Sequence, residues 1–358
     1  MIVPERSKSP INQMKSIKTL VRQTLLHLEE KYEDKTEDRL QDIKVFLDKN
    51  ENPYNSPTNR YAYAAGNELR TTLGLLKRIQ PHCITLTNGT DEAIDFLIRT
   101  FCTPNIDRIL YAAPTMREYK RMSLANNVDS DAFLLSKDFQ LSAQHLLNQC
   151  TENTKIIFLC SPGNPTGNLL ERKEIELVCQ SFDGLVVIDE SYIEFSNKES
   201  WTHSISKYNN LVVLNTFSYA FASADLRLTV IYAVPDVIKY INLLIPHYHI
   251  SKRTEDEAVK ILRRRFDVDK WVHHLLEEKR KVIAAIRILP ICEDIYPTDT
   301  NFFLAKFKDA DTIYEYLLKE GIAVRNCSML PLCENCLRIT IGLPHENCQL
   351  ISALRTYE

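Results

Sequence analysis

Short apolar runs that alternate with helical patterns constrain the fold of this chain more than any other feature. Helical stretches such as 91–101 and 173–180 lie between runs that have the length and the β-branched content of buried strands. Strands that alternate with helices predict an α/β fold, with a mostly parallel sheet covered by helices on both faces. The predicted strands are 83–86, 108–112, 155–160, 185–188, 211–214 and 228–233.

The same patterns divide the chain into three parts. Residues 1–45 are polar with scattered leucines and predict an N-terminal helical arm, whereas residues 46–290 predict a large domain. Residues 291–358 predict a smaller α+β domain, which is joined by part of the N-terminal segment. Its expected strands are 302–307, 323–325 and 336–341, its expected helix is 311–320, and one long helix over 255–288 precedes it.

Composition excludes several classes of function. A net charge of −3 and a pI near 6.3 give no electrostatic case for binding nucleic acid or an anionic membrane. No apolar run approaches 18 residues and no apolar segment follows the basic N-terminus, so we expect neither a membrane span nor a signal peptide. The ten cysteines then predict reduced thiols in a cytoplasmic protein.

Three of these cysteines lie close together in the sequence. Cys333 and Cys336, with Cys327 nearby, have a spacing that metal and redox sites use. A zinc site needs a fourth ligand within reach, and the sequence supplies no clear one. We therefore predict ordinary thiols and no metal.

Polar clusters follow the predicted strands, at the edge of a parallel sheet where ligands bind. Gly89, Thr90 and Asp91 open a helix after the first strand, and backbone N–H groups at such a start can bind an anion. A plain helix cap by Thr90 or Asp91 explains this motif equally well. Asn164 lies in a turn rich in proline and glycine, and Asp189 ends an apolar strand.

One further cluster follows the strand at 211–214. Ser218 and Arg227 supply a hydroxyl and a guanidinium, which together suit one phosphate group. Each cluster alone is a weak signal, but their common position after successive strands makes the set much stronger.

The order and spacing of these clusters resemble the histidinol-phosphate aminotransferases, a group of fold-type-I pyridoxal-phosphate enzymes. The resemblance covers about residues 45–357 and implies a fold-type-I aminotransferase-like architecture, in which the large domain binds the cofactor. The segments that carry it are 47–53 (LDKNENP), 59–61 (NRY), 88–92 (NGTDE), 114–115 (PT), 164–167 (NPTG), 189–192 (DESY), 215–227, 324–325 (VR) and 337–342 (LRITIG).

The resemblance implies roles for individual residues of this chain. Asp189 would pair with the pyridine nitrogen, while Asn164 and Tyr192 would bind the ring hydroxyl of pyridoxal phosphate. Tyr61 would reach the cofactor phosphate of a partner subunit, which implies a homodimer. The cofactor phosphate would be held by Ser218, Arg227 and the backbone of Gly89, Thr90 and Asp91, and an anionic substrate by Arg325, Arg338, Asn50 and Glu51.

Departures from the family pattern gather on the reacting side of the cofactor. Tyr219 occupies the position of the lysine that forms the Schiff base, and a phenol has no amine with which to form an imine. Met116 stands where an aromatic residue stacks on the cofactor ring. The segments 62–64 (AYA) and 246–249 (PHYH) replace a Pro-Asp-Pro and a Pro-Tyr-Asn sequence.

These departures leave several functions open. The first is a pseudoenzyme that binds pyridoxal or pyridoxamine phosphate without a covalent link, with transamination lost or strongly impaired. The second is an enzyme that uses another base: Tyr219 itself, Lys49, Lys252 or His249. The third is a non-catalytic subunit that pairs with an active homologue, and the fourth is a retained transaminase of histidine biosynthesis that acts on histidinol phosphate and 2-oxoglutarate. The substrate expected in each case is an anionic amino acid or a phosphate ester.

Overall fold

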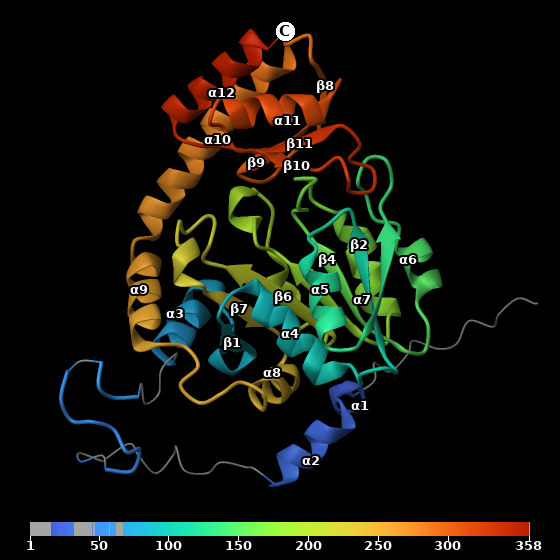
Figure 1. Cartoon of the computed structure of the whole chain (residues 1–358). Helices are drawn as coiled ribbons and strands as arrows, with labels where there is room; N and C mark the ends of the chain where they lie inside the picture. The colour runs from blue at the N-terminus through green and yellow to red at the C-terminus, as the bar shows by residue number, and fades with distance from the viewer. Residues whose placement is uncertain (1–15, 32–44, 46, 57, 62–66, 358) are drawn as a thin grey trace, which may run out of the picture.

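A seven-stranded sheet forms the centre of the computed structural model, which describes residues 16–31, 45, 47–56, 58–61 and 67–357 (Figure 1). The strand order is β1-β7-β6-β5-β4-β2-β3, and only β7 runs antiparallel to its neighbours. The predicted α/β class with a mostly parallel sheet is confirmed. The strands are β1 (Ile84–Thr87), β2 (Arg108–Ala113), β3 (Asp129–Leu134), β4 (Thr154–Cys160), β5 (Leu185–Asp189), β6 (Leu211–Thr216) and β7 (Thr229–Tyr232).

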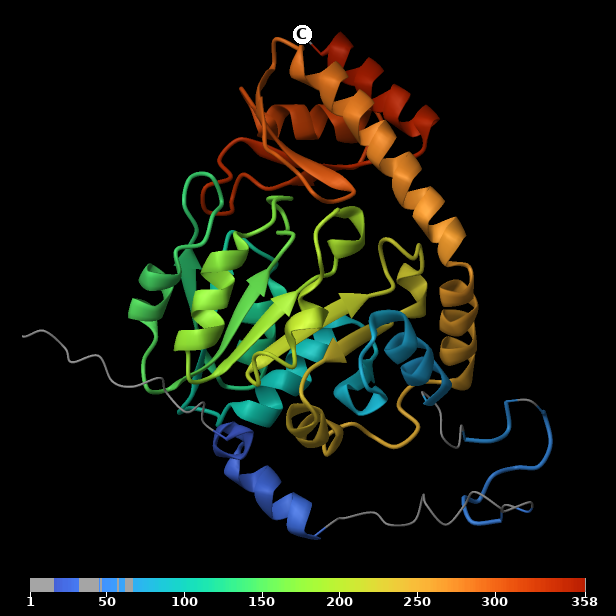
Figure 2. The same ribbon diagram turned by 180° about the vertical axis from the view of Figure 1, so that it is seen from behind.

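Helices cover both faces of this sheet, which explains the continuous apolar runs of its central strands (Figures 1 and 2). One face is covered by α4 (Thr90–Phe101), α5 (Glu118–Ala125) and α8 (Pro235–Asn242). The other face is covered by α3 (Asn67–Lys77), α6 (Ala143–Gln149), α7 (Arg172–Ser181) and α9 (Lys252–Arg263). Single 3₁₀ turns lie at Pro81–Cys83, Ile193–Phe195, Trp201–Ser204 and Ala224–Leu226.

The edge strand β3 was not predicted from the sequence. Most residues of β3 are exposed, among them Asp129 and Asp131. Only Phe133 is buried. Because most of its residues are exposed, this strand has no continuous apolar run. The pattern that revealed the central strands was therefore missing here.

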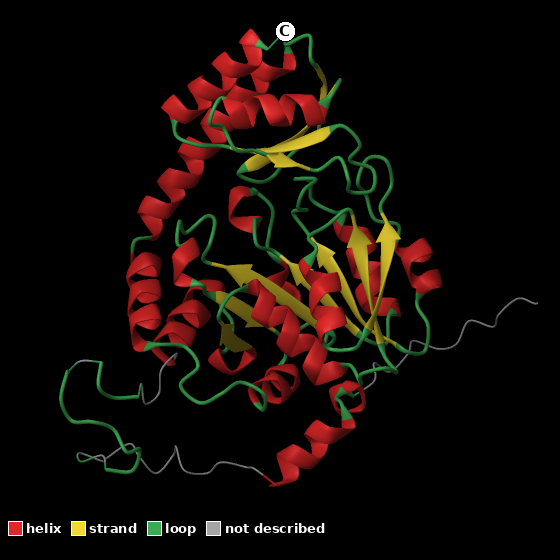
Figure 3. Cartoon of the chain, viewed as in Figure 1, coloured by secondary structure: helices red, strands yellow, loops and turns green. Residues whose placement is uncertain are grey.

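A smaller antiparallel sheet lies above the large one and carries three helices (Figure 3). Its order is β10-β11-β9-β8, and the three predicted strands and the predicted helix are present. The predicted division of the chain near residue 290 stays a prediction. The elements are α10 (Arg265–Arg287), β8 (Cys292–Ile295), β9 (Phe302–Phe307), α11 (Ala310–Lys319), β10 (Arg325–Asn326), β11 (Cys336–Thr340) and α12 (Pro344–Thr356).

The single helix predicted over 255–288 is wrong, because the structure has two helices that meet at Arg264. Helix α9 packs against α3 of the large sheet, whereas α10 crosses to the small sheet and packs against β8 and α12. The chain changes direction between them (Figure 1). No proline or glycine marks this break, so it follows from packing on two different surfaces.

The N-terminal arm packs on the large domain, as the leucine pattern predicts. Helices α1 (Ile17–Leu20) and α2 (Gln23–Lys31) place Ile17, Leu20 and Leu25 in the core beneath α4 and α8. The remainder of the predicted arm, 1–15 and 32–44, lies outside the described residues. Within the described ranges, no helix is long and apolar enough to cross a membrane.

Candidate active site

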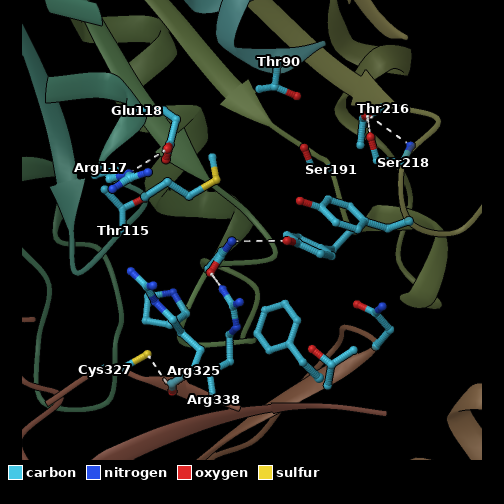
Figure 4. A pocket seen from close by; sticks show the side chains of 18 of the residues that line it. Thr90, Thr115, Arg117, Glu118, Ser191, Thr216, Ser218, Arg325, Cys327 and Arg338 are labelled. Atoms are coloured by element: carbon cyan, nitrogen blue, oxygen red, sulfur yellow. Dashed lines mark hydrogen bonds and ion pairs between the residues drawn. The ribbon is translucent and has the colours of Figure 1, made fainter. Parts of the chain in front are cut away.

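A cavity of about 510 Å³ lies where the carboxyl ends of the large sheet's strands meet the small sheet (Figure 4). Side chains from both sheets line it, although they lie up to 250 residues apart in the sequence. Most of the site residues predicted from the sequence lie here together. They are Thr90, Asp91, Met116, Asn164, Tyr192, Ser218, Tyr219, Arg227, Arg325 and Arg338.

One end of the cavity has the features of an anion site. Helix α4 begins there after Gly89, whose φ of 93° is a left-handed conformation that glycine adopts without strain. A Cβ on Gly89 would lie 2.5 Å from Nη2 of Arg227, so the absence of a side chain makes room for the guanidinium. Arg227 has no ion-pair partner among the described residues. Ser218 adds a hydroxyl that accepts a hydrogen bond from Thr216 Oγ1 at 3.0 Å.

Gly89→Ala is expected to weaken anion binding at this end by displacing the Arg227 guanidinium. Its control is Gly321→Ala, because Gly321 also has a positive φ of 76° but nothing lies within 4 Å of its would-be Cβ. Both changes should cost roughly 1–2 kcal/mol of folding stability through the left-handed backbone. Only Gly89→Ala should weaken the binding of inorganic phosphate or pyridoxamine phosphate in a calorimetric titration. Equal binding by the two variants would contradict the assigned role of Gly89.

Asp189 lies fully buried at the end of β5, beside Ser191 in the cavity wall. Its Oδ1 accepts hydrogen bonds from the backbone N–H of Ser191 at 3.0 Å and from Ser191 Oγ at 2.5 Å. Its Oδ2 accepts a hydrogen bond from the Tyr119 hydroxyl at 3.2 Å. Burial raises the pKa of Asp189, and these three donors oppose the rise. A cationic N–H group in the cavity would stabilise the ionised carboxylate further.

Tyr119 is a functional neighbour that the sequence did not reveal. It lies on α5, 70 residues before Asp189, and its ring stacks on Phe158 with the ring centroids 4.8 Å apart. A buried tyrosine on an amphipathic helix is indistinguishable from any other core residue in the sequence. The cavity also contains Thr115, Arg117, Glu118, Ser191, Thr216, Asn301 and Phe302, to which we assigned no role from the sequence.

The adjacent Glu190 gives a testable pH dependence. It is buried, and burial raises its pKa from 4.5 to about 7 despite hydrogen bonds from Ser200 Oγ and the Trp201 N–H. Because the folded protein holds this proton more tightly than the unfolded chain, folding stability is highest below pH 4.5 for this group and falls as the pH rises through 7. The loss is about 3 kcal/mol at 1.36 kcal/mol per pH unit.

Glu190→Gln should therefore reduce the loss of stability between pH 5 and pH 8, since glutamine does not ionise. Urea denaturation of both proteins at the two pH values measures this difference. Glu176→Gln is the matched control, because Glu176 is a partly exposed carboxylate on α7. An equal slope for the parent and Glu190→Gln would show that Glu190 is not the group that titrates.

A hydrogen-bonded chain crosses the floor of the cavity. Nη1 of Arg338 donates to Oδ1 of Asn164 at 2.5 Å, and Nδ2 of Asn164 donates to the Tyr192 hydroxyl at 3.2 Å. The Tyr192 ring meets Phe302 edge-on, with ring centroids 5.0 Å apart and planes at 88°. Burial raises the pKa of Tyr192 well above its usual value, so the hydroxyl stays protonated at neutral pH. The chain fixes the orientation of Asn164 and Tyr192.

Arg325 and Arg338 lie side by side on the small sheet, where they are paired residues of β10 and β11 (Figure 4). Neither has an ion-pair partner among the described residues, and Nε of Arg338 is buried without a hydrogen-bond acceptor. Oγ1 of Thr115 and Oδ1 of Asn301 are also buried without partners. Two unpaired guanidiniums are well suited to an anionic ligand.

Tyr219 lines the cavity at the position of the expected lysine. Its ring stacks on Tyr192 with centroids 4.4 Å apart and planes at 18°, and 39% of the residue stays exposed. Among the described residues that line the cavity, none is a lysine. The described lining of the cavity therefore presents a phenol and no primary amine.

The other candidate bases lie away from the cavity lining. Lys252 pairs with Asp256 at 2.8 Å on the exposed face of α9, and Nε2 of His249 lies 2.6 Å from Oε2 of Glu92. Nζ of Lys49 lies 5.6 Å from the ring centroid of Tyr248. None of the three is among the described residues that line the cavity.

Three residues predicted for the site lie on the N-terminal segment and are not among the residues that line the cavity. Glu51 pairs with Arg60 at 2.7 Å and accepts the backbone N–H of Tyr61 at 2.6 Å. Asn50 is exposed, and so is Tyr61, whose ring stacks on Tyr248. Their roles stay predictions, and the altered segment 62–64 lies outside the described residues.

Comparison with known proteins gives the relatives of this fold and site. A sequence profile described as aminotransferase class I and II matches residues 32–353. The histidinol-phosphate aminotransferase of Bacteroides fragilis is 41% identical over 345 residues, which cover 96% of this chain and 100% of that protein. The solved histidinol-phosphate aminotransferase of Clostridium acetobutylicum has a TM-score of 0.76 at 20% identity, covering 83% of this chain and 91% of the other.

A second solved structure contains a ligand. The histidinol-phosphate aminotransferase of Sinorhizobium meliloti, solved in complex with pyridoxal-5'-phosphate, has a TM-score of 0.76 at 20% identity and covers 83% of this chain and 82% of the other. These structural likenesses confirm the fold-type-I architecture that the sequence predicts. From the profile match and the 41% identity over almost the whole chain, this protein belongs to the class I and II aminotransferase family and is histidinol-phosphate aminotransferase-like.

Proposed function

We propose that this protein binds pyridoxal or pyridoxamine phosphate without a covalent link and has lost most or all transamination activity. Membership of the family indicates pyridoxal phosphate as the cofactor. The observation that carries the proposal is Tyr219, which stacks on Tyr192 in the place of the lysine while no described cavity residue supplies an amine. According to this proposal, the protein is a pseudoenzyme that keeps the cofactor-binding site and lacks the catalytic lysine.

The residues of the cavity fit the cofactor at its non-reacting groups. Arg227, Ser218 and the N-terminus of α4 offer the guanidinium, hydroxyl and N–H donors that a phosphate needs. Asp189 offers a buried carboxylate that a pyridinium N–H would stabilise. When bound, pyridoxal phosphate supplies an electron sink for carbanion chemistry.

Other residues would orient the ring and the substrate. Asn164 and Tyr192 would hydrogen-bond the ring hydroxyl, and the chain from Arg338 holds both in place. Arg325 and Arg338 would bind the anionic end of an amino acid or phosphate ester. Met116, in the cavity wall, gives an apolar contact where an aromatic ring is expected.

The group that moves the proton is missing from this arrangement. Loss of one positioned general base lowers a rate by roughly 10² to 10⁴, and loss of the amine removes covalent catalysis as well. The phenol of Tyr219 can donate and accept a hydrogen bond but cannot form an imine. Binding would therefore survive while the reaction would not.

The test is an absorbance titration of the purified protein with pyridoxal phosphate, followed by borohydride reduction and peptide mapping. We expect saturable binding that borohydride cannot make permanent. A reduced cofactor on a lysine peptide would overturn the proposal and favour an enzyme in which another lysine has taken over. Absence of saturable binding below about 1 mM, a free energy of roughly −4 kcal/mol, would leave a non-catalytic subunit as the better function.

A homodimer is part of the proposal. Tyr61 is 54% exposed on a segment outside its own cavity, which is consistent with a role in the site of a partner subunit. Sedimentation velocity measures the assembly, and Tyr61→Ala should weaken binding of the cofactor phosphate in a dimer. A cytoplasmic location follows from the cysteine content as a prediction.

A further inference from the structure

The acidic side chains that line the cavity form ion pairs, whereas three of the lining arginines have no ion-pair partner in the described part of the chain. Asp91 pairs with Arg121 at 3.0 Å, and Glu118 pairs with Arg117 at 3.3 Å, so both acidic side chains of the lining are already neutralised. The remaining charged side chains that line the cavity are all guanidiniums without ion-pair partners among the described residues: Arg227, Arg325 and Arg338. The cavity therefore favours a ligand with more than one negative charge.

These guanidiniums form two separate anion-binding ends. Arg227 lies beside the start of α4 on the large sheet, whereas Arg325 and Arg338 belong to the small sheet. Figure 4 shows Thr90 and Ser218 on one side of the cavity and the two small-sheet arginines on the other. A ligand that satisfies both ends must carry an anionic group at each end.

Tyr219 lies between the two ends. It follows Ser218 of the first end directly in the chain, and it stacks on Tyr192, which is connected through Asn164 to Arg338 of the second end. Tyr192 is buried beneath it and packs edge-on against Phe302. Tyr219 is therefore a side chain of the cavity lining that the middle of a ligand spanning both ends can contact.

We propose that the cavity selects the amine form of the cofactor, and secondary-amine conjugates of it with anionic amino acids, over the aldehyde form. This inference rests on the proposed function and adds to it the chemical form of the ligand. It assigns Tyr219 a positive role in selection, beyond the loss of a catalytic group.

Tyr219 favours the amine form in two ways: it lacks the amine of a lysine, and its phenol can contact an ammonium group. A lysine at this position would hold the aldehyde covalently and would repel the ammonium of pyridoxamine phosphate, whereas tyrosine does neither. The phenol oxygen can accept a hydrogen bond from an ammonium group, and the exposed ring face attracts a cation. The aldehyde gains neither contact and loses its covalent partner.

A conjugate adds the second anionic end to the same molecule. In a phosphopyridoxyl amino acid the phosphate can reach Arg227, the secondary amine can lie against Tyr219, and the carboxylate can reach Arg325. Binding of the second anion is then intramolecular, which raises the overall affinity without a second loss of translational freedom. One such ligand would therefore use an arginine at each end of the cavity, Arg227 and Arg325.

The experiment compares three probes by calorimetry: pyridoxal phosphate, pyridoxamine phosphate and N-(5'-phosphopyridoxyl)-L-glutamate. The aldehyde is measured by displacement of the bound amine form, so that its reaction with surface lysines does not count. We expect pyridoxamine phosphate to bind at least tenfold more tightly than pyridoxal phosphate, and the conjugate at least tenfold more tightly than pyridoxamine phosphate. An aldehyde affinity equal to or above that of the amine form would overturn the inference while leaving the non-covalent binder intact.

Three variants assign the selectivity to residues. Tyr219→Lys should reverse the preference toward pyridoxal phosphate, whereas Tyr219→Phe should keep the amine form favoured because the ring stays neutral. Arg325→Met should lower the affinity of the conjugate tenfold or more and that of pyridoxamine phosphate far less. An unchanged ratio in Tyr219→Lys would contradict the role of Tyr219, and failure of all three probes to bind would refute both this inference and the proposed function.

Discussion

Tyr219→Lys is expected to give the protein a covalently held cofactor and to raise transamination by at least about 10²-fold. The lysine would enter a cavity that Asn164 and Arg227 line, with the buried Asp189 beside Ser191 of its wall, and these are the groups proposed to bind the cofactor. Its amine would supply both the link to the aldehyde and the base that moves the proton. Amino-donor-dependent conversion of 2-oxoglutarate to glutamate, together with peptide mapping after borohydride reduction, measures the two effects.

The control for this prediction is Tyr219→Met. Methionine has nearly the length of lysine and removes the Tyr192 stacking partner in the same way, but it has no amine. It should therefore open the cavity without restoring activity. If Tyr219→Lys forms the covalent link but stays inactive, the changed residue Met116 and the segment 62–64 are the next positions to restore. If Tyr219→Lys forms no covalent link at all, Tyr219 does not occupy the lysine position.

Arg227→Met is expected to lower the affinity for pyridoxamine phosphate by about 10- to 100-fold. The Arg227 guanidinium has no ion-pair partner in the part of the chain that the structure describes, so its charge is available to the ligand. Hydrogen bonds to charged groups contribute about 1.5–3 kcal/mol, and each 1.4 kcal/mol changes the affinity tenfold. Methionine preserves much of the side-chain volume beside Gly89 while it removes the charge. Calorimetric titration at two salt concentrations measures the loss.

Arg325→Met is the matched control, because Arg325 is an unpaired arginine at the opposite end of the same cavity. It should leave the affinity for pyridoxamine phosphate within about threefold, since a ligand with one phosphate uses the Arg227 end. Similar losses in both variants would mean that the phosphate has no fixed end in the cavity. The salt dependence of binding should also be smaller in Arg227→Met than in the parent protein.

The architecture could be predicted largely because both faces of the central sheet are buried. Strands such as β5 and β6 are buried along their whole length, and each begins with an uninterrupted run of four apolar residues that is easily recognised. The edge strand β3 and the polar strand β8 lack this signal and were missed. The break between α9 and α10 at Arg264 was missed for a different reason. No local residue preference marks it, because it results from the packing of the two helices on different surfaces.

The site was predicted to the extent that its residues follow strands. Asn164, Asp189 and Ser218 lie after successive parallel strands, whose carboxyl ends share one edge of the sheet. Tyr119 has no such marker, because it reaches Asp189 from a helix 70 residues earlier. The segment with Asn50, Glu51 and Tyr61 was assigned to the site by resemblance, and in the protomer it lies outside the cavity.

The sequence by itself determined the family, and it predicts the central chemical conflict by placing Tyr219 where the family resemblance implies a lysine. It also determined the layered fold, because burial on both faces leaves a direct record in the apolar pattern. Only the tertiary structure decided the surroundings of Tyr219: it stacks on Tyr192 and faces a cavity whose two cationic ends have no ion-pair partners within the described ranges. The reason is that stacking and charge compensation depend on distances between residues far apart in the chain, and a linear pattern does not contain those distances.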